Sequence, residues 1–397
     1  MHLLDHHAVL LSPSDLTTAA TCEFAFLRDL DGRLGRSEPL TEPADAMLAR
    51  AAVLGMAHER RVLDAYIAEF SEARPSSDPL APNAVGGVLV LERPGAGTEA
   101  LAAAINATLA ALVRGIDVVA QGAVGDGRFG GFADFLIKQP DGDGGHSYVV
   151  EDTKLARRAK VPALIQIAAY ADLLAAAGVP IAPVARLRLG SGDVMEYRLD
   201  DIVPVYRVRR ARLEAVVDEH LADDGAVAWG DERYSACGVC PACEVEVVAN
   251  RDLRLVAGMR GTQRAKLMSV GIRTIDALAA STDEVPGMST RTLENLRSQA
   301  RLQVRSSQAD GVGEHSNVEI PTEVFDPAPI QSLPEPSSGD LFFDFEGDPL
   351  WTGDDHADWG LEYLFGMLDT AGHFTHLWSD DRAAEQRALA AFFTRVR

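Results

Sequence analysis

The chain has 397 residues, of which 47% are hydrophobic and 24% are charged, and its formal net charge is −22 at pH 7. This length exceeds what one hydrophobic core usually holds, so two or three domains are expected. No stretch approaches the roughly 20 apolar residues of a membrane span, and the start lacks the features of a secretory signal. We therefore predict a cytoplasmic protein with no membrane partner. The acidic balance argues against nonspecific nucleic-acid binding over the whole surface.

The first 70 residues have a helical pattern. A first helix is predicted near Ser12, with Ser14 or Asp15 as its cap, and a longer amphipathic helix is predicted over residues 43–70. Residues 115–155 then change to short β-rich runs, with the turn QPDGDGG between GGFADFLIK and HSYVVEDTK. This order predicts a β-hairpin that follows a helical opening.

A helix and a strand are predicted after the hairpin. The run VPALIQIAAYADLLAAAG has Pro162 in its first turn and Gly178 at its end, as in many helices, and VARLRLG is typical of a further strand. A hairpin, a helix and another strand predict an α/β core.

The hairpin brings charged residues together. If it is symmetric about Asp143, Asp134 lies opposite Asp152, an unfavourable pair of like charges unless a cation lies between them. Because side chains alternate along a strand, Asp152 and Lys154 share one face and Glu151 points to the other. Carboxylate oxygens suit Mg²⁺ or Mn²⁺, and the lysine would orient or help deprotonate an attacking water. A surface hairpin with solvated acids is the alternative.

Other polar residues flank the hairpin. Gln166 and Tyr170 are four apart, so they lie on one face of the predicted helix. His58 lies in GMAHERRVL on the upstream helix, where a single histidine is more often a core residue than a ligand.

In their order, these motifs resemble the RecB-like branch of the PD-(D/E)xK nuclease superfamily, which includes CRISPR-associated RecB-type exonucleases. The match runs from the helical histidine through GGFAD and DTK to QIAAY and covers roughly residues 12–245. It implies a restriction-endonuclease-like core over residues 1–248 that acts on DNA, expected to be an exonuclease on single strands in repair or recombination.

The metal ligands implied by the resemblance are His58, Asp134 and Asp152, together with the backbone carbonyl after Asp152. The implied catalytic residues are Asp134, Asp152, Lys154, Gln166 and Tyr170. Glu151 stays as an alternative acid, because E-x-x-K also fits the motif.

Three of the four cysteines are crowded into one segment. Cys237, Cys240 and Cys243 form C-x-x-C-x-x-C, whereas Cys22 lies more than two hundred residues earlier. Zinc usually takes its ligands from two close pairs of residues. Three clustered cysteines and one distant cysteine therefore favour a [4Fe–4S] cluster without excluding zinc. Iron–sulfur members of the RecB-like nucleases have the same arrangement of one early and three late cysteines. Their last gap is often longer, which makes Cys243 the least secure ligand.

A basic segment follows the cysteines. Residues 251–305 contain ten Lys or Arg and five Asp or Glu, and two apolar-x-Gly-apolar turns separate their helical stretches. These turns are similar to helix-hairpin-helix modules, which bind the phosphate backbone without reading sequence. Ordinary helix packing, with a solvated basic face, is an equal alternative.

The last part of the chain begins after a predicted linker, the polar and proline-rich residues 306–339. In LFFDFEG, Asp344 and Glu346 are two apart on a strand and so share a face, as in the first motif of two-metal exonucleases of the RNase H-like DEDD class. We expect residues 340–397 to be an incomplete RNase H-like α/β domain. The assembly resembles RecB-like nucleases that continue into a helicase, so the chain is expected to be an N-terminal fragment.

Two other functions compete with a RecB-type nuclease. One is a non-catalytic nucleic-acid-binding module that is stabilised by the cysteine cluster. The other assigns the cleavage to the DEDD-like unit.

Overall fold

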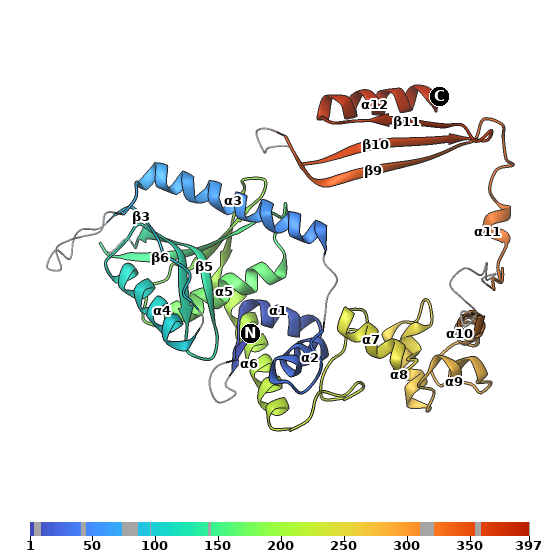
Figure 1. Cartoon of the computed structure of the whole chain (residues 1–397), viewed down its shortest axis with the longest axis horizontal. Coiled ribbons are helices and arrows are strands. Elements are labelled where there is room, and N and C mark those ends of the chain that lie inside the picture. Colours follow the sequence, from blue (N-terminus) through green and yellow to red (C-terminus); the bar gives the residue numbers. More distant parts are fainter. Residues whose placement is uncertain are drawn as a thin grey trace.

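The computed structural model describes residues 1–3, 9–40, 45–73, 86–95, 97–141, 144–309, 321–353 and 359–396. Figure 1 shows an α/β domain, a group of short helices and a C-terminal sheet covered by one helix. None of the helices in these ranges is both long and apolar enough to cross a membrane.

The α/β domain is built on a six-stranded mixed sheet. In spatial order its strands are β3 (Val88–Val90), β4 (Val118–Gly125), β5 (Gly130–Pro140), β6 (His146–Lys154), β7 (Val184–Leu189) and β8 (Val194–Arg198). The pairs β3–β4 and β6–β7 are parallel, and the other neighbours are antiparallel. The predicted hairpin is β5–β6 and lies at the centre of the sheet, so the predicted α/β core is confirmed.

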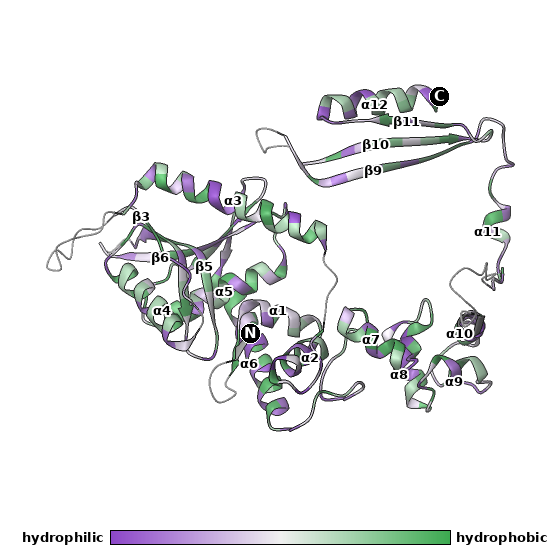
Figure 2. Ribbon diagram, viewed as in Figure 1, coloured by the Kyte–Doolittle hydropathy of each residue, from purple (hydrophilic) through white to green (hydrophobic). Residues whose placement is uncertain are grey.

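Helices cover both faces of this sheet. Helix α3 (Ala46–Phe70) packs Val62 and Tyr66 on Phe135 of β5, and helix α5 (Val161–Ala176) lies in the larger core that contains Leu136 and Val150. Hydrophobic residues run along most of α5, whereas α3 alternates hydrophobic and hydrophilic residues (Figure 2). The remaining elements are β1 (His2–Leu3), β2 (Val9–Leu10), α1 (Pro13–Thr21), α2 (Glu23–Leu34), α4 (Thr98–Val113) and α6 (Leu199–Leu221).

The first helix begins earlier than expected. Its cap is Ser12, so the prediction of Ser14 or Asp15 was wrong. The Asp15 carboxylate accepts a hydrogen bond from the Ser12 amide at 2.8 Å and completes a capping box. Asp45 caps the longer predicted helix, whose expected first residue, Pro43, lies outside the described residues.

The basic segment folds into short helices around its own apolar core. They are the 3₁₀ turn η2 (Leu253–Leu255), α8 (Gly261–Ser269), α9 (Ile275–Ala280) and the longer α10 (Thr290–Ala309). Helix α7 (Pro241–Ala249) precedes this segment and places Cys243 in the core of the α/β domain. Gly258 and Gly287 have φ values of 80° and 73° in the two predicted turns, a backbone conformation that favours glycine. Helix α10 ends at Ala309, so the helical segment runs past the predicted boundary at residue 305.

Residues 321–340 run to the C-terminal sheet as exposed chain, interrupted by α11 (Ala328–Gln331). The antiparallel sheet has the order β11 (Phe374–Trp378), β10 (Trp359–Asp369) and β9 (Leu341–Thr352). Helix α12 (Arg382–Arg395) packs Phe392 against Phe365 and Met367 on one face.

Candidate active site and cysteine centre

The observed register of β5 and β6 is the one that the sequence predicts. Phe135 pairs with Glu151, and the pairing continues to Pro140 and His146, which centres the hairpin on residue 143. The same register brings Asp134 level with Asp152. The turn residues 142 and 143 themselves lie outside the described residues.

Asp152 is fully buried and lies at the centre of a polar network. Gln166 Nε2 donates to its Oδ1 at 3.2 Å, and the Lys154 ammonium forms an ion pair with its Oδ2. Gln166 Nε2 also donates to the Tyr170 hydroxyl at 3.1 Å, so the helix carrying Q-x-x-x-Y faces the hairpin as predicted. Burial and the neighbouring Asp134 raise the pKa of Asp152 to about 7, although Lys154 opposes this shift.

Asp134 is held by the strand beside it. The Thr153 amide and hydroxyl each donate to Asp134 Oδ2 at 2.8 Å. Close by, Tyr170 packs over Gly131, where a Cβ atom would lie 2.8 Å from the tyrosine ring. Glycine is therefore required there for the helix to approach β5 closely. Five of the predicted site residues are thus brought together, namely Asp134, Asp152, Lys154, Gln166 and Tyr170.

His58 is buried on α3, with 5% of its surface exposed, and its Nε2 has no hydrogen-bond partner in the described part of the chain. Burial and the nearby Arg61 lower the pKa of its imidazole, which favours the neutral form that binds metals, whereas the charge of Asp134 acts in the opposite direction. The ring nitrogens of His58 and the carboxylates of Asp134 and Asp152 lie farther apart than the sulfurs of the four cysteines, which form the one tight group of possible metal ligands among the described residues.

Glu151, the alternative acid, faces α3 instead. It accepts hydrogen bonds from Tyr66 Oη and from Arg188 Nε, both at 2.8 Å, and it is fully buried. These contacts make it the centre of a buried structural ion pair, so the strand-parity argument for Asp152 agrees with the geometry.

Sequence reasoning missed two residues beside the site. Glu59 follows His58 on α3 and accepts a hydrogen bond from Gln121 Nε2, while burial and the charge of Asp134 raise the pKa of Glu59. Gln121 lies in β4 at φ 58°, and Arg93 Nε donates to its Oε1 at 3.1 Å. A left-handed non-glycine residue inside a strand is strained, and such strain is often found at functional sites. Glu59 was visible in GMAHE, but no local pattern indicates Gln121.

Comparison with protein families matches residues 10–248 to the PD-(D/E)XK nuclease superfamily. The chain belongs to this superfamily. No curated protein and no solved structure gives a significant match. Membership suggests nuclease activity, a nucleic-acid substrate and the divalent metal that PD-(D/E)XK nucleases typically use.

The PD-(D/E)XK domain also contains the cysteine centre. The four cysteine sulfurs all lie within 4.8 Å of one another, so Cys22, Cys237, Cys240 and Cys243 form a group that could bind a metal. Cys243, the least secure ligand by spacing, is fully buried, and its Sγ lies 3.5 Å from that of Cys22. The Cys237 amide donates to Cys22 Sγ at 3.4 Å, and the Ala25 amide donates to it at 3.3 Å.

The PD-(D/E)XK domain and the short helices meet beside this centre. Arg254 donates from Nη1 to the Cys237 carbonyl at 2.9 Å. Asp252 accepts hydrogen bonds from Trp229 Nε1 at 3.3 Å and from Arg264 Nε at 2.8 Å. Several cations of the basic segment are therefore used in packing. Those with no side-chain hydrogen bond or ion pair to any described residue are Arg260, Arg273, Arg291 and Arg305.

The predicted second site, Asp344 and Glu346, lies on β9, where both side chains are exposed. They belong to the face of the sheet that carries the exposed Phe342 and Trp378, opposite α12. Among the described residues, no further His, Cys, Asp or Glu joins them in a group that could hold a metal.

Proposed function

We propose that the chain is a metal-dependent DNA nuclease of the RecB-like branch, which hydrolyses phosphodiester bonds of single-stranded DNA from an end. The observation that carries this proposal is the fully buried Asp152 carboxylate, which lies beside Lys154 and level with Asp134. A buried acid next to a second acid costs free energy unless a cation compensates it.

The side chains around Asp152 fit a divalent cation. Asp152 Oδ2 is buried with no hydrogen bond in the described structure, although Lys154 pairs with it, and the buried His58 Nε2 also has no partner there. A buried imidazole nitrogen without a partner, such as His58 Nε2, is what a metal ligand would show. We assign Asp134, Asp152 and His58 as the residues that would hold Mg²⁺ or Mn²⁺. When bound, the ion would lower the pKa of a water and polarise the phosphate.

The protein's own residues have distinct roles in this proposal. Thr153 fixes Asp134, and Gln166, itself hydrogen-bonded to Tyr170, fixes the rotamer of Asp152. Ligand positions held in this way do not have to reorganise during the reaction. The Lys154 ammonium orients the attacking water and offsets the negative charge that develops on the phosphate.

For the four cysteines we propose a [4Fe–4S] cluster, which the three-plus-one spacing of the ligands supports. A single zinc ion is the second candidate, because the Cys22–Cys243 and Cys237–Cys243 sulfur distances are 3.5 and 3.9 Å. Four thiolates at about 2.3 Å from one tetrahedral ion lie about 3.8 Å apart. In a cubane cluster each thiolate binds a different iron, so the sulfurs would move apart.

We further propose that β9–β11 and α12 belong to an RNase H-like unit and that the four unpaired arginines of the helix-hairpin-helix-like segment hold the DNA backbone. A helicase region in a longer protein is the partner that the likeness to RecB-type nucleases suggests. Asp344 and Glu346 share one face of β9, as the first motif of such a unit requires.

The test uses the whole 397-residue chain and two substrates, an end-labelled linear oligonucleotide and a circular single strand. We expect Mn²⁺-dependent loss of the linear strand, resistance of the circle, and no cleavage by Asp134→Ala that retains the wild-type circular dichroism spectrum. Cleavage of the circle would indicate an endonuclease. DNA binding without cleavage under any divalent metal would favour the non-catalytic binding module, and cleavage that survives Asp134→Ala but not Asp344→Ala would favour the DEDD-like unit.

A further inference from the structure

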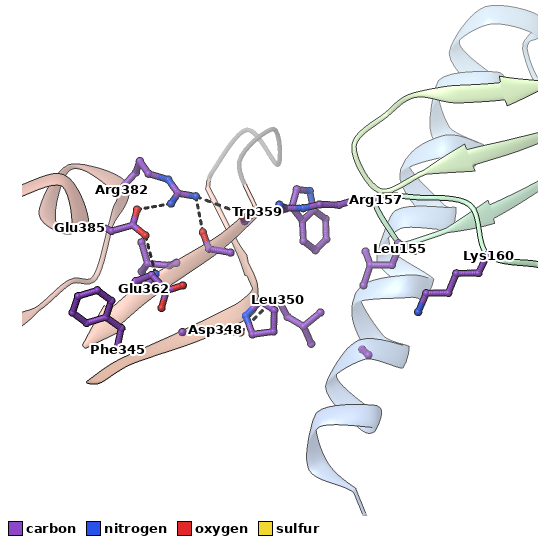
Figure 3. Close-up of a pocket in the computed structure, with 16 residues that line it drawn as sticks. Leu155, Arg157, Lys160, Phe345, Asp348, Leu350, Trp359, Glu362, Arg382 and Glu385 are labelled. Atoms are coloured by element: carbon purple, nitrogen blue, oxygen red, sulfur yellow. Dashed lines mark hydrogen bonds and ion pairs between the residues drawn. The ribbon is translucent and has the colours of Figure 1, made fainter. Parts of the chain in front are cut away.

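A cleft lies between the PD-(D/E)XK domain and the C-terminal sheet, with a cavity of about 950 Å³. One wall is Ala51 of α3 together with the loop 155–160, which begins directly after Lys154, and the other wall belongs to β9 and β10 (Figure 3). An ion pair of 2.8 Å between Arg50 and Asp348 joins the two walls. Because the lining loop follows Lys154 directly, the cleft begins one residue after a residue of the candidate active site.

The loop 155–160 carries three exposed cations, of which Arg157 and Lys160 line the cleft and Arg158 lies between them in the chain. None of them forms an ion pair or a side-chain hydrogen bond with any residue in the described ranges. Arg157 extends toward β10, where its Nη2 lies 3.6 Å from the position that a Cβ atom of Gly360 would take. Exposed cations at a cleft that no acid in the described structure neutralises favour an anionic ligand there.

Some other arginines near the α/β core are used in structural pairs. On α6, Arg207 pairs with Asp172 at 2.6 Å and Arg212 pairs with Glu23 at 2.7 Å. The loop cations differ because no acid in the described structure neutralises them. They also lie closer in the chain to the candidate catalytic residues.

The acids that line the cleft are mostly neutralised. Asp348 pairs with Arg50, and Glu385 pairs with Arg382. Glu362 has no ion pair within the described ranges, so its negative charge disfavours an anion in the cleft. The remaining surface is largely apolar and is formed by Leu155, Pro349, Leu350, Trp359 and Leu361.

We infer that this cleft binds the stretch of single-stranded nucleic acid next to the scissile phosphate. The cations would bind the phosphates, and the apolar wall would contact bases that an unpaired strand exposes but a duplex keeps stacked inside. This inference rests on the proposed nuclease function, because it assigns the substrate path of that site. It makes the C-terminal sheet part of the substrate-binding surface.

The experiment measures binding without cleavage. The whole 397-residue chain with Asp152→Asn is titrated in EDTA with fluorescent oligothymidylate of about 16 nucleotides over a series of salt concentrations. Adding Arg157→Ala, Arg158→Ala and Lys160→Ala should weaken binding at least about tenfold and reduce the slope of log K against log salt by about 2. A duplex of the same length should bind more weakly and lose less affinity on the triple substitution.

Two further variants make the result specific. Removing three exposed arginines outside the cleft that also have no acid partner in the described structure, Arg114, Arg209 and Arg387, should leave the salt slope nearly unchanged. Glu362→Gln should tighten binding, because it removes the carboxylate that opposes the phosphates. An unchanged slope in the loop variant, or equal losses in both triple variants, would overturn the inference and leave the cleft as a packing contact. Failure of the nuclease function would instead appear as absent cleavage by the wild type with intact binding.

Discussion

Gln166 Nε2 lies 3.2 Å from Asp152 Oδ1 and 3.1 Å from the Tyr170 hydroxyl, so both amide hydrogens have acceptors in the site. This relationship ties helix α5 to the end of strand β6. It explains why residues four apart on a helix belong to the same site as a carboxylate on the hairpin. The buried carboxylate has one preferred orientation because the amide is itself anchored.

Gln166→Ala should therefore lower the cleavage rate by about 10- to 100-fold, as loss of a partner that orients a metal ligand commonly does. The Mn²⁺ concentration that gives half-maximal cleavage should rise, whereas the DNA dissociation constant measured in EDTA should stay the same. Tyr170→Phe retains the ring that packs on Gly131, so it should show a smaller loss. A wild-type Mn²⁺ requirement in Gln166→Ala would argue against a positioning role.

Glu151→Gln should lower the free energy of unfolding by about 2 kcal/mol, because the partly buried Arg188 would lose the carboxylate that neutralises it. Denaturant unfolding followed by circular dichroism measures this change. The folded variant should still cleave DNA when it is assayed well below its unfolding midpoint. Wild-type stability combined with complete loss of cleavage would assign the catalytic acid to Glu151.

The part of the candidate site on the β5–β6 hairpin was predictable, because the alternation of side chains along a strand and the position of the turn determine it. Alternation along the strand and the central turn give the register of β5 and β6, and with it the partners Asp134 and Asp152. The cysteine spacing indicated a shared ligand, but only the fold brings Cys22 beside Cys243, which lies 221 positions later in the chain. Gln121 was not predictable, because its left-handed backbone reflects tertiary contacts with Glu59 and Arg93.

Loss of the cysteine centre should destabilise the domain, because Cys22 joins the start of the α/β domain to its end. Anaerobically purified wild type should be brown and contain about four irons per chain. Cys22→Ser and Cys243→Ser should both lose the iron and unfold at lower temperature, which metal analysis and thermal denaturation measure. Cys243→Ser with full iron content would remove that residue from the ligand set, and one zinc ion without iron would replace the cluster by the second candidate.

The contact between the PD-(D/E)XK domain and the short helices should depend on pH through Asp252. Burial disfavours its ionised form, but hydrogen bonds from Arg264 and from the Arg254 amide outweigh burial and hold the pKa below its ordinary value. A depressed carboxyl pKa contributes stability that is present above the unfolded pKa of about 3.9 and is lost as the pH falls through the folded pKa.

Asp252→Asn should accordingly cost about 2–3 kcal/mol of unfolding free energy at pH 7 and progressively less below about pH 4. Urea unfolding of both proteins between pH 7 and pH 3 measures the difference. Asp276→Asn is the control, since its partner Arg251 is exposed and a surface pair contributes little. A stability difference that stayed constant as the pH fell would contradict the role of the ionised carboxylate.

The most direct test of the central claim is the rate of single-strand cleavage as a function of Mn²⁺ concentration in wild type, Asp152→Asn and Glu151→Gln. We predict that the wild-type rate rises to saturation, that Glu151→Gln follows it at a temperature where it is folded, and that folded Asp152→Asn shows no cleavage at any concentration of the ion. Cleavage by Asp152→Asn at the wild-type rate would contradict the assignment of the buried carboxylate as a ligand of the catalytic metal.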